Sequence, residues 1–213
     1  MVKIFCVNTQ TSKTFPEGTT LMDMLPSFDF ERPYPILCAK VNNVSQGLKY
    51  RAFNSRKVEF HDYTSYLGRS VYCNSLCFLL CKAAKDVFPD CRVILRRPIS
   101  KGYFCSIDKG DGAELSISDL DMIKRRMLEL VDADVPFRRH EVLLDEAIEL
   151  FRSLGYEDKV KLLETSGDVY VNYYTLEDTP DYYYDALLSS TGNLKVWSLE
   201  MYRDGLLLRV PNR

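Results

Sequence analysis

The chain of 213 residues contains 28 basic and 30 acidic side chains, which give a net charge of −2. This balance excludes nucleic-acid binding through the overall charge alone, so any RNA contact requires a local basic patch. Hydrophobic residues make up 46% and charged residues 27%, which is not the composition of a disordered chain. One large domain or two small domains are expected for this length.

The N-terminal apolar run is too short for a signal peptide, because polar Asn8 follows it at once. No apolar run approaches the ~20 residues that a membrane-spanning helix needs. The 7 cysteines are odd in number and lie mostly in apolar runs, which favours reduced thiols over a disulfide framework. We therefore expect a cytoplasmic protein without a membrane partner.

The first part of the chain predicts a β-rich unit. A short helix at residues 19–25 is expected to begin at a threonine and to end at Pro26. Because strands precede and follow this helix, the order favours a β-grasp domain. The expected strands are residues 3–7, 14–18, 35–41, 48–51 and 58–60.

The rest of the chain begins with helical periodicity at residues 70–87. A second helix is expected to begin at Ser118, with Asp121 as its capping partner. A third helix is expected at residues 145–154 and to end at Gly155. The domain boundary is expected near residues 61–69. The expected strands are residues 92–95, 102–107, 169–174, 194–199 and 206–210.

The first part contains two motifs, Phe-Pro-Glu-Gly-Thr-Thr-Leu at residues 15–21 and Ala-Lys-Val-Asn-Asn at residues 39–43, and Val-Glu-Phe at residues 58–60 closes the unit. Together they resemble a TGS domain, the β-grasp module of threonyl-tRNA synthetases and of some GTPases and stringent-response enzymes. The resemblance assigns residues 1–62 to this domain.

Later motifs resemble the editing domain that follows TGS in threonyl-tRNA synthetases and also occurs in alanyl-type enzymes. Their order and spacing carry the resemblance, which assigns residues 63–213 to an editing-like domain, also called SAD. The implied fold class is α+β, a β-grasp (ubiquitin-like) domain followed by an α/β domain. The motifs are residues 88–90, 101–104, 132–137, 146–151 and 190–192.

The editing family holds zinc with a His-x3-His pair and a Cys-x3-His pair. The resemblance places these ligands on Asn74, Phe78, Tyr183 and Leu187. Phenylalanine and leucine cannot ligate a metal, so the resemblance implies a lost metal site and no metal-activated water. We expect neither a metal nor a catalytic residue in this chain.

A further set of motifs resembles the N-terminal part of the long uridine or nucleoside kinases of Bacteroides-type bacteria. This resemblance implies a downstream P-loop kinase domain in the same polypeptide, with ATP and Mg²⁺ bound there and no cofactor in this chain. The chain contains no G-x-x-x-x-G-K-[ST] motif, so it cannot cradle ATP phosphates by that loop. The motifs are residues 40–45, 99–105, 159–167, 181–184 and 204–209.

Cys73, Cys77 and Cys81 share one face of the first long helix. They are either a metal or redox site or a face of small packing residues, and packing is favoured because one helix face cannot surround a tetrahedral ion. His61 has no nearby partner motif and is expected to be structural.

Two polar clusters are candidates for ligand binding. The basic run at residues 138–140 either contacts RNA phosphate or a nucleotide, or is a solvated face. The tyrosines at residues 182–184 either stack on a ligand or fill the space of the lost metal site. The candidate residues are Lys101, Tyr103, Arg138, Arg139, His140, Asp181, Tyr182, Tyr183 and Tyr184.

Three functions follow from these observations. The first is a non-catalytic region that binds a nucleotide, amino acid or RNA and regulates an attached uridine (nucleoside) kinase domain. The alternative is a trans-acting tRNA-editing hydrolase or an RNA-binding module, and the third is a structural spacer. A hydrolase would need polar groups aimed at the reacting atoms, and Phe78 and Leu187 do not supply them.

Overall fold

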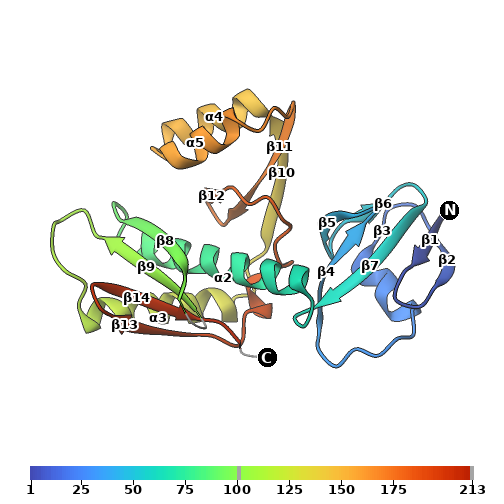
Figure 1. Cartoon of the computed structure of the whole chain (residues 1–213), viewed down its shortest axis with the longest axis horizontal. Coiled ribbons are helices and arrows are strands. Elements are labelled where there is room, and N and C mark those ends of the chain that lie inside the picture. The colour runs from blue at the N-terminus through green and yellow to red at the C-terminus, as the bar shows by residue number, and fades with distance from the viewer. Residues whose placement is uncertain (100–101, 212–213) are drawn as a thin grey trace.

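The computed structural model describes residues 1–99 and 102–211, except for the side chains of residues 96–98. Figure 1 shows a β-rich N-terminal part beside a larger part that is built around one long helix, α2 (Tyr66–Val87). Several sheets and helices alternate along the chain, which confirms the predicted α+β fold class. Within the described residues, we find no helix with the length and hydrophobicity needed to cross a membrane.

The N-terminal part is a five-stranded sheet with a short helix packed on one face, as in a β-grasp domain. Its elements are β1 (Val2–Cys6), β2 (Thr11–Phe15), β3 (Thr19–Thr20), α1 (Leu21–Met24), η1 (Leu25–Ser27), β4 (Ile36–Val41), β5 (Val44–Gly47), β6 (Arg51–Ala52) and β7 (Arg56–Asp62). The strand order is β2-β1-β7-β4-β5, and the central pair β1–β7 is parallel. Ile4, Met24 and Phe28 are buried in the core between the sheet and the helix.

Helix α2 is buried along most of its length. It begins after Ser65, whose hydroxyl accepts a hydrogen bond from the backbone N–H of Gly68 at 3.0 Å. Both sides of the helix carry buried apolar residues, which is expected for a helix surrounded by the rest of the protein. Even Lys82 is only 3% exposed, and it forms ion pairs of 2.7 Å with both Asp86 and Asp178.

A four-stranded antiparallel sheet and a second long helix, α3 (Ile117–Asp132), pack with α2 (Figure 1). The strands are β8 (Arg92–Ile99), β9 (Gly102–Asp108), β13 (Ser198–Tyr202) and β14 (Gly205–Arg209), in the order β13-β14-β9-β8. Cys105 and Leu206 from the sheet and Ile123 and Met127 from α3 join the same core as α2.

The third unit is a three-stranded antiparallel sheet that carries two short helices. It contains β10 (Phe137–Leu143), α4 (Leu144–Ser153), α5 (Glu157–Glu164), β11 (Tyr170–Leu176) and β12 (Thr179–Asp181). Gly155 joins the two helices at a φ of +73°, a left-handed conformation that favours glycine. Phe151, Leu163 and Val171 form a separate small core between the helices and the sheet.

The N-terminal sheet is attached to the second part through β5 and the loop that follows β12. The Ser45 hydroxyl accepts a hydrogen bond from the backbone N–H of Ala186 at 3.1 Å. Arg139 donates a hydrogen bond to the Gln46 side chain. Leu37 and Cys38 are buried in the core of the second part although they belong to the first. The domain ranges 1–62 and 63–213 stay predictions.

The predicted start of α3 at Ser118 is wrong, because the helix is capped two residues earlier. The Ser116 hydroxyl accepts from the Asp119 N–H at 3.2 Å, and Asp119 accepts from the Ser116 N–H at 2.9 Å. The spacing Ser-x-x-Asp occurs at both positions in the sequence. Lys109 selects the first, because its ammonium group forms a 3.1 Å ion pair with Asp119.

Other expected elements differ in position. Of residues 48–51 only Arg51 lies in a strand, and residues 194–197 form no strand because η2 (Thr191–Asn193) and a loop precede β13. Strand β10 and helix α5 were not predicted. The charged side chains at residues 138–141 conceal the strand, and the helix at residues 157–164 is only two turns long.

We expect Ser116→Ala to lower the free energy of unfolding by about 1 kcal/mol, the usual cost of losing a helix N-cap. Ser118→Ala is the matched control, since Ser118 is exposed inside the first turn and caps nothing. Urea denaturation followed by circular dichroism measures both variants. A larger loss for Ser118→Ala than for Ser116→Ala would contradict the observed start of the helix.

Candidate functional site

The positions that the resemblance assigns to metal ligands lie on α2 and on the loop after β12. The Tyr183 ring packs against the Phe78 ring with centroids 5.6 Å apart, and the Phe137 ring also packs against Phe78, at 5.8 Å. Leu187 is buried in the same core, whereas Asn74 is partly exposed on α2. Apolar packing therefore surrounds three of the four positions that the resemblance assigns to metal ligands.

These residues do not fit a zinc ion. Zinc in proteins takes cysteine, histidine or carboxylate ligands, and Phe78 and Leu187 offer no donor atom. The part of the chain that the structure describes contains no group of three or more histidine, cysteine, aspartate or glutamate side chains that could hold a metal. A metal-activated water consequently has no place in the chemistry of this site.

A partly buried ion pair lies beside the Tyr183 ring. Lys159 of α5 and Asp181 at the end of β12 are 3.0 Å apart, and Asp181 also accepts a 2.7 Å hydrogen bond from the Tyr182 N–H. Burial alone lowers the pKa of Lys159, but the charge and hydrogen bond of Asp181 outweigh it and leave the pKa raised. The Lys159 ammonium group also lies 5.5 Å from the centre of the Tyr183 ring.

The Tyr183 hydroxyl is held in its neutral form. Burial raises its pKa well above the ordinary value, and the negative charge of Asp181 adds to this effect. The hydroxyl is hydrogen-bonded to Asp181, so Tyr183, Asp181 and Lys159 form one connected polar group. The group can position a ligand by hydrogen bonding, and it carries little net charge because the ammonium and carboxylate groups neutralise each other.

The three cysteines on α2 do not provide reactive thiolates. Burial raises the pKa of Cys73, Cys77 and Cys81, which keeps all three thiols protonated at neutral pH. The Tyr103 hydroxyl is hydrogen-bonded to Cys73, and burial also raises the pKa of Tyr103. This environment matches the packing interpretation of the cysteine spacing.

The basic run does not act as one patch, because consecutive strand residues point to opposite faces of the sheet. Arg139 faces the N-terminal part and donates to Asn172 at 2.9 Å. His140 stacks on Tyr173 with ring centroids 4.9 Å apart and is hydrogen-bonded to Thr175 at 2.9 Å. Arg138 is exposed, and the described residues provide it with no hydrogen-bond or ion-pair partner.

The tyrosine run is also divided. Tyr182 packs against the small core of α4 and α5, and Tyr183 packs against Phe78. Tyr184 is 94% exposed. The next residue, Asp185, accepts a 3.3 Å hydrogen bond from the Ser70 hydroxyl. This bond places the chain around Tyr184 next to the first half of α2. Lys101, the remaining candidate, lies outside the described residues.

His61 is a junction residue with an incomplete set of partners. Its Nε2 atom is buried without a hydrogen bond in the described structure, and it lies 3.8 Å from Glu59. Burial lowers the pKa of His61 more than Glu59 raises it. The residue is therefore neutral at physiological pH, as expected for a structural histidine.

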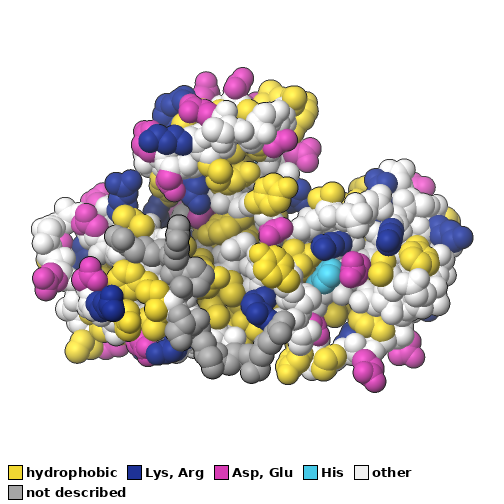
Figure 2. All heavy atoms as spheres, viewed as in Figure 1, with side chains coloured by type: hydrophobic (Ala, Val, Ile, Leu, Met, Phe, Trp, Pro, Cys, Tyr) yellow, Lys and Arg dark blue, Asp and Glu magenta, His cyan; other side chains and the backbone are white. Residues whose placement is uncertain are grey.

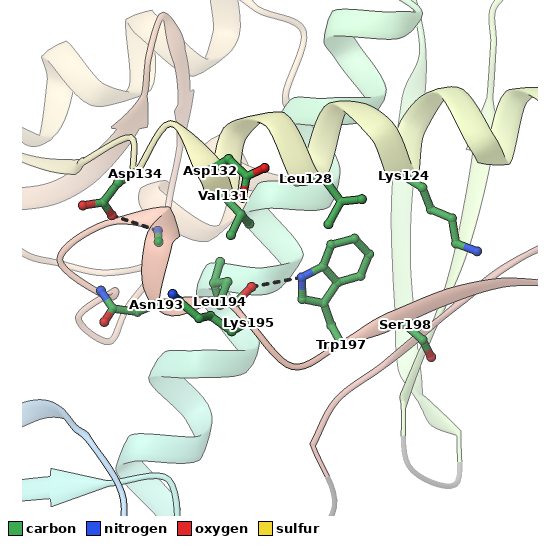
Figure 3. Close-up of a pocket in the computed structure, with 11 residues that line it drawn as sticks. Lys124, Leu128, Val131, Asp132, Asp134, Asn193, Leu194, Lys195, Trp197 and Ser198 are labelled. Carbon is green, nitrogen blue, oxygen red and sulfur yellow. Dashed lines mark hydrogen bonds between the residues drawn. The ribbon is translucent and has the colours of Figure 1, made fainter.

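Two surface hollows differ in character. Figure 2 shows hydrophobic side chains in the hollow between the part that carries α4 and α5 and the body of the molecule. A separate open groove of about 840 Å³ lies between α3 and residues 192–198. Figure 3 shows the residues that line it. Trp197 lies in this groove and donates a 3.0 Å hydrogen bond to the Leu194 carbonyl. The groove has two lysines and two aspartates, so it has no preference for either sign of charge.

Curated relatives of the chain are threonine–tRNA ligases. The chain is 31% identical over 188 residues to the enzyme of Syntrophotalea carbinolica, which covers 88% of this chain and 29% of that ligase. It is 26% identical over 199 residues to the enzyme of Azobacteroides pseudotrichonymphae, which covers 93% of this chain and 31% of that ligase. No family model matches the chain.

The chain is therefore homologous to the N-terminal TGS and editing region of threonine–tRNA ligases. It spans less than a third of the length of these relatives, at 29% to 31%. The resemblance to TGS and editing domains is confirmed at this level. The kinase resemblance receives no support from these relatives, all of which are ligases.

The sequence did not identify Lys159 as a site residue. Lys159 and Asp181 are separated by 21 residues and lie in different elements, so no helical or strand periodicity brings them together. Lys159 and Asp181 come together only because α5 packs against the end of β12 in the folded structure. A lysine at the start of a short amphipathic helix gives no sign by itself of an internal partner.

We expect Lys159→Met to lower the free energy of unfolding by about 3 kcal/mol at pH 7, because it leaves the Asp181 carboxylate buried without its partner. Lys161→Met is the control, since Lys161 lies on the exposed face of the same helix. Urea denaturation at pH 7 measures both variants.

In the wild type, Lys159 has a raised pKa in the folded state. Its contribution to stability is therefore complete below the unfolded pKa of a lysine, about 10.4, and is lost as the pH rises through the folded pKa. Equal stability of Lys159→Met and Lys161→Met at pH 7 would show that the ion pair does not stabilise the fold.

Proposed function

We propose that the chain is an RNA-binding module that holds the acceptor end of tRNA without hydrolysing the aminoacyl bond. The observation that carries this proposal is the contact between the rings of Phe78 and Tyr183, two residues at positions that the resemblance assigns to metal ligands. The homology to the N-terminal region of threonine–tRNA ligases supports tRNA as the partner.

The environment of Tyr183 supports binding rather than hydrolysis. Hydrolysis of an ester needs an activated water and a group that stabilises the developing oxyanion. Lys159 and Asp181 satisfy each other at 3.0 Å, and the Tyr183 hydroxyl stays protonated at neutral pH. None of these groups is free to act as a general base.

The exposed Tyr184 supports recognition of a nucleotide. A tyrosine that is 94% exposed contributes no packing energy to the fold, but it offers a flat surface on which a base can stack. It follows directly after Tyr183, so a base stacked on it would lie at the edge of the editing-like site. Arg138, which has no partner among the described residues, is the candidate phosphate contact.

The regulatory role beside a uridine (nucleoside) kinase domain remains a prediction that depends on the resemblance alone. So do the predictions of ATP and Mg²⁺ in that domain. An RNA-binding module is compatible with attachment to another domain, but the relatives named above favour a partner from tRNA chemistry.

We expect Tyr184→Ser to weaken binding of an unacylated tRNA by about tenfold, because base–aromatic stacking contributes about 1–3 kcal/mol. Tyr170→Ser is the matched control. Tyr170 is also exposed, at 61%, but it lies at the start of β11 and not in the loop that carries Tyr184. Fluorescence anisotropy with labelled tRNA gives the dissociation constants. No measurable binding by the wild type, or equal binding by both variants, would contradict the proposal.

A further inference from the structure

The outer face of the N-terminal sheet carries an aromatic residue among basic side chains. Side chains alternate along a strand, and Ile4 and Val58 point into the core. Phe5 of β1 and Lys57 of β7 therefore point outward, and the register places them directly opposite each other. Phe5 is not part of the hydrophobic core below, so core packing does not account for an aromatic residue at this position.

A shallow pocket of about 370 Å³ lies on this face around Phe5. Three cationic residues line it, Lys3, Arg56 and Lys57, and its other lining residues are uncharged and polar. No carboxylate lines the pocket. The described residues form no ion pair with any of the three cations, so their charges are available to a ligand.

The backbone around the pocket is held in place by side-chain hydrogen bonds. The Ser55 hydroxyl accepts a hydrogen bond from the backbone N–H of Lys3 at 3.1 Å. The side-chain oxygen Oδ1 of Asn42 accepts one from the backbone N–H of Lys57 at 2.9 Å. These bonds fix the strand ends from which Lys3 and Lys57 project. The nearest acidic residue along β7 is Glu59, which faces His61 at 3.8 Å.

We propose that this face binds a single-stranded RNA segment, with a base stacked on Phe5 and the flanking phosphates held by Lys3, Arg56 and Lys57. Phe5 is half-buried and lines the pocket, so part of its ring is accessible to an unpaired base, and the surrounding cations suit a phosphate backbone. This inference rests on the proposed function, because it takes RNA as the ligand of the chain. It assigns the chain a second contact, on a different domain from Tyr184.

The test uses the full chain and a labelled single-stranded oligoribonucleotide in fluorescence anisotropy titrations at several salt concentrations. Phe5→Ala should weaken binding by about tenfold through loss of stacking. Lys3→Gln and Lys57→Gln should each reduce the slope of log K against log salt by about 0.7, the value for one phosphate contact on a single strand.

The controls are Tyr34→Ala, an aromatic residue of the same part that is 54% exposed outside the pocket, and Lys161→Gln on α5. Both should bind the oligoribonucleotide as the wild type does. If Phe5→Ala and Lys57→Gln also bind like the wild type, the second contact does not exist. If the same variants instead lose binding only to phosphatidylserine vesicles, the partner is a lipid surface and the RNA inference is wrong.

The two proposals fail in different ways. Loss of tRNA binding in Tyr184→Ser but not in Phe5→Ala would support the editing-like site and overturn the second contact. Phe5-dependent binding of the oligoribonucleotide without Tyr184-dependent binding of tRNA would support the second contact and overturn the first proposal. Circular dichroism spectra and unfolding midpoints equal to those of the wild type confirm that each variant is folded.

Discussion

The burial of α2 is the constraint on which the rest of the structure depends. The helix lies between the four-stranded sheet, the three-stranded sheet and the edge of the N-terminal part (Figure 1). Ser75 in its middle is fully buried, and the Ser75 hydroxyl accepts a 2.9 Å hydrogen bond from the Leu188 N–H while donating to the Val71 carbonyl. The helix thereby fixes the loop that carries Tyr183, Tyr184 and Leu187.

This constraint bears on the proposal that the editing-like site has lost its metal. Metal ligands on a buried helix would be held by the ion, and without the ion their polar atoms would need other partners. Phe78 and Leu187 remove that need, and burial of each such side chain contributes about 2 kcal/mol of hydrophobic free energy. The Phe78–Tyr183 contact joins α2 to the loop that follows β12.

Much of the architecture could be predicted from the sequence, because long apolar periodicities and turn residues mark it. The β-grasp order, the helix at residues 70–87 and the helix at residues 145–154 all follow from such patterns. The start of α3 could not be predicted, because two Ser-x-x-Asp spacings compete and Lys109 decides between them. Strand β10 could not be predicted either, since the run of charged and polar residues at positions 138–141 hides the alternation that marks a strand.

The site was predicted only in part, for a related reason. The run from Asp181 to Tyr184 is visible in the sequence, but only the structure shows that Tyr183 is buried and Tyr184 is exposed. The ion pair of Asp181 with Lys159 depends on tertiary packing that no local pattern reports. The three residues of the basic run looked equivalent, and the strand separates them onto two faces.

The proposed function separates binding of RNA at the editing-like site from cleavage of the aminoacyl bond. The most direct measurement is the deacylation rate of a mischarged tRNA at a saturating concentration of the full chain, with and without added zinc. The account predicts the spontaneous rate in both cases while anisotropy shows the tRNA to be bound. An accelerated rate that Lys159→Met or Asp181→Asn abolishes would contradict it and identify the chain as a hydrolase.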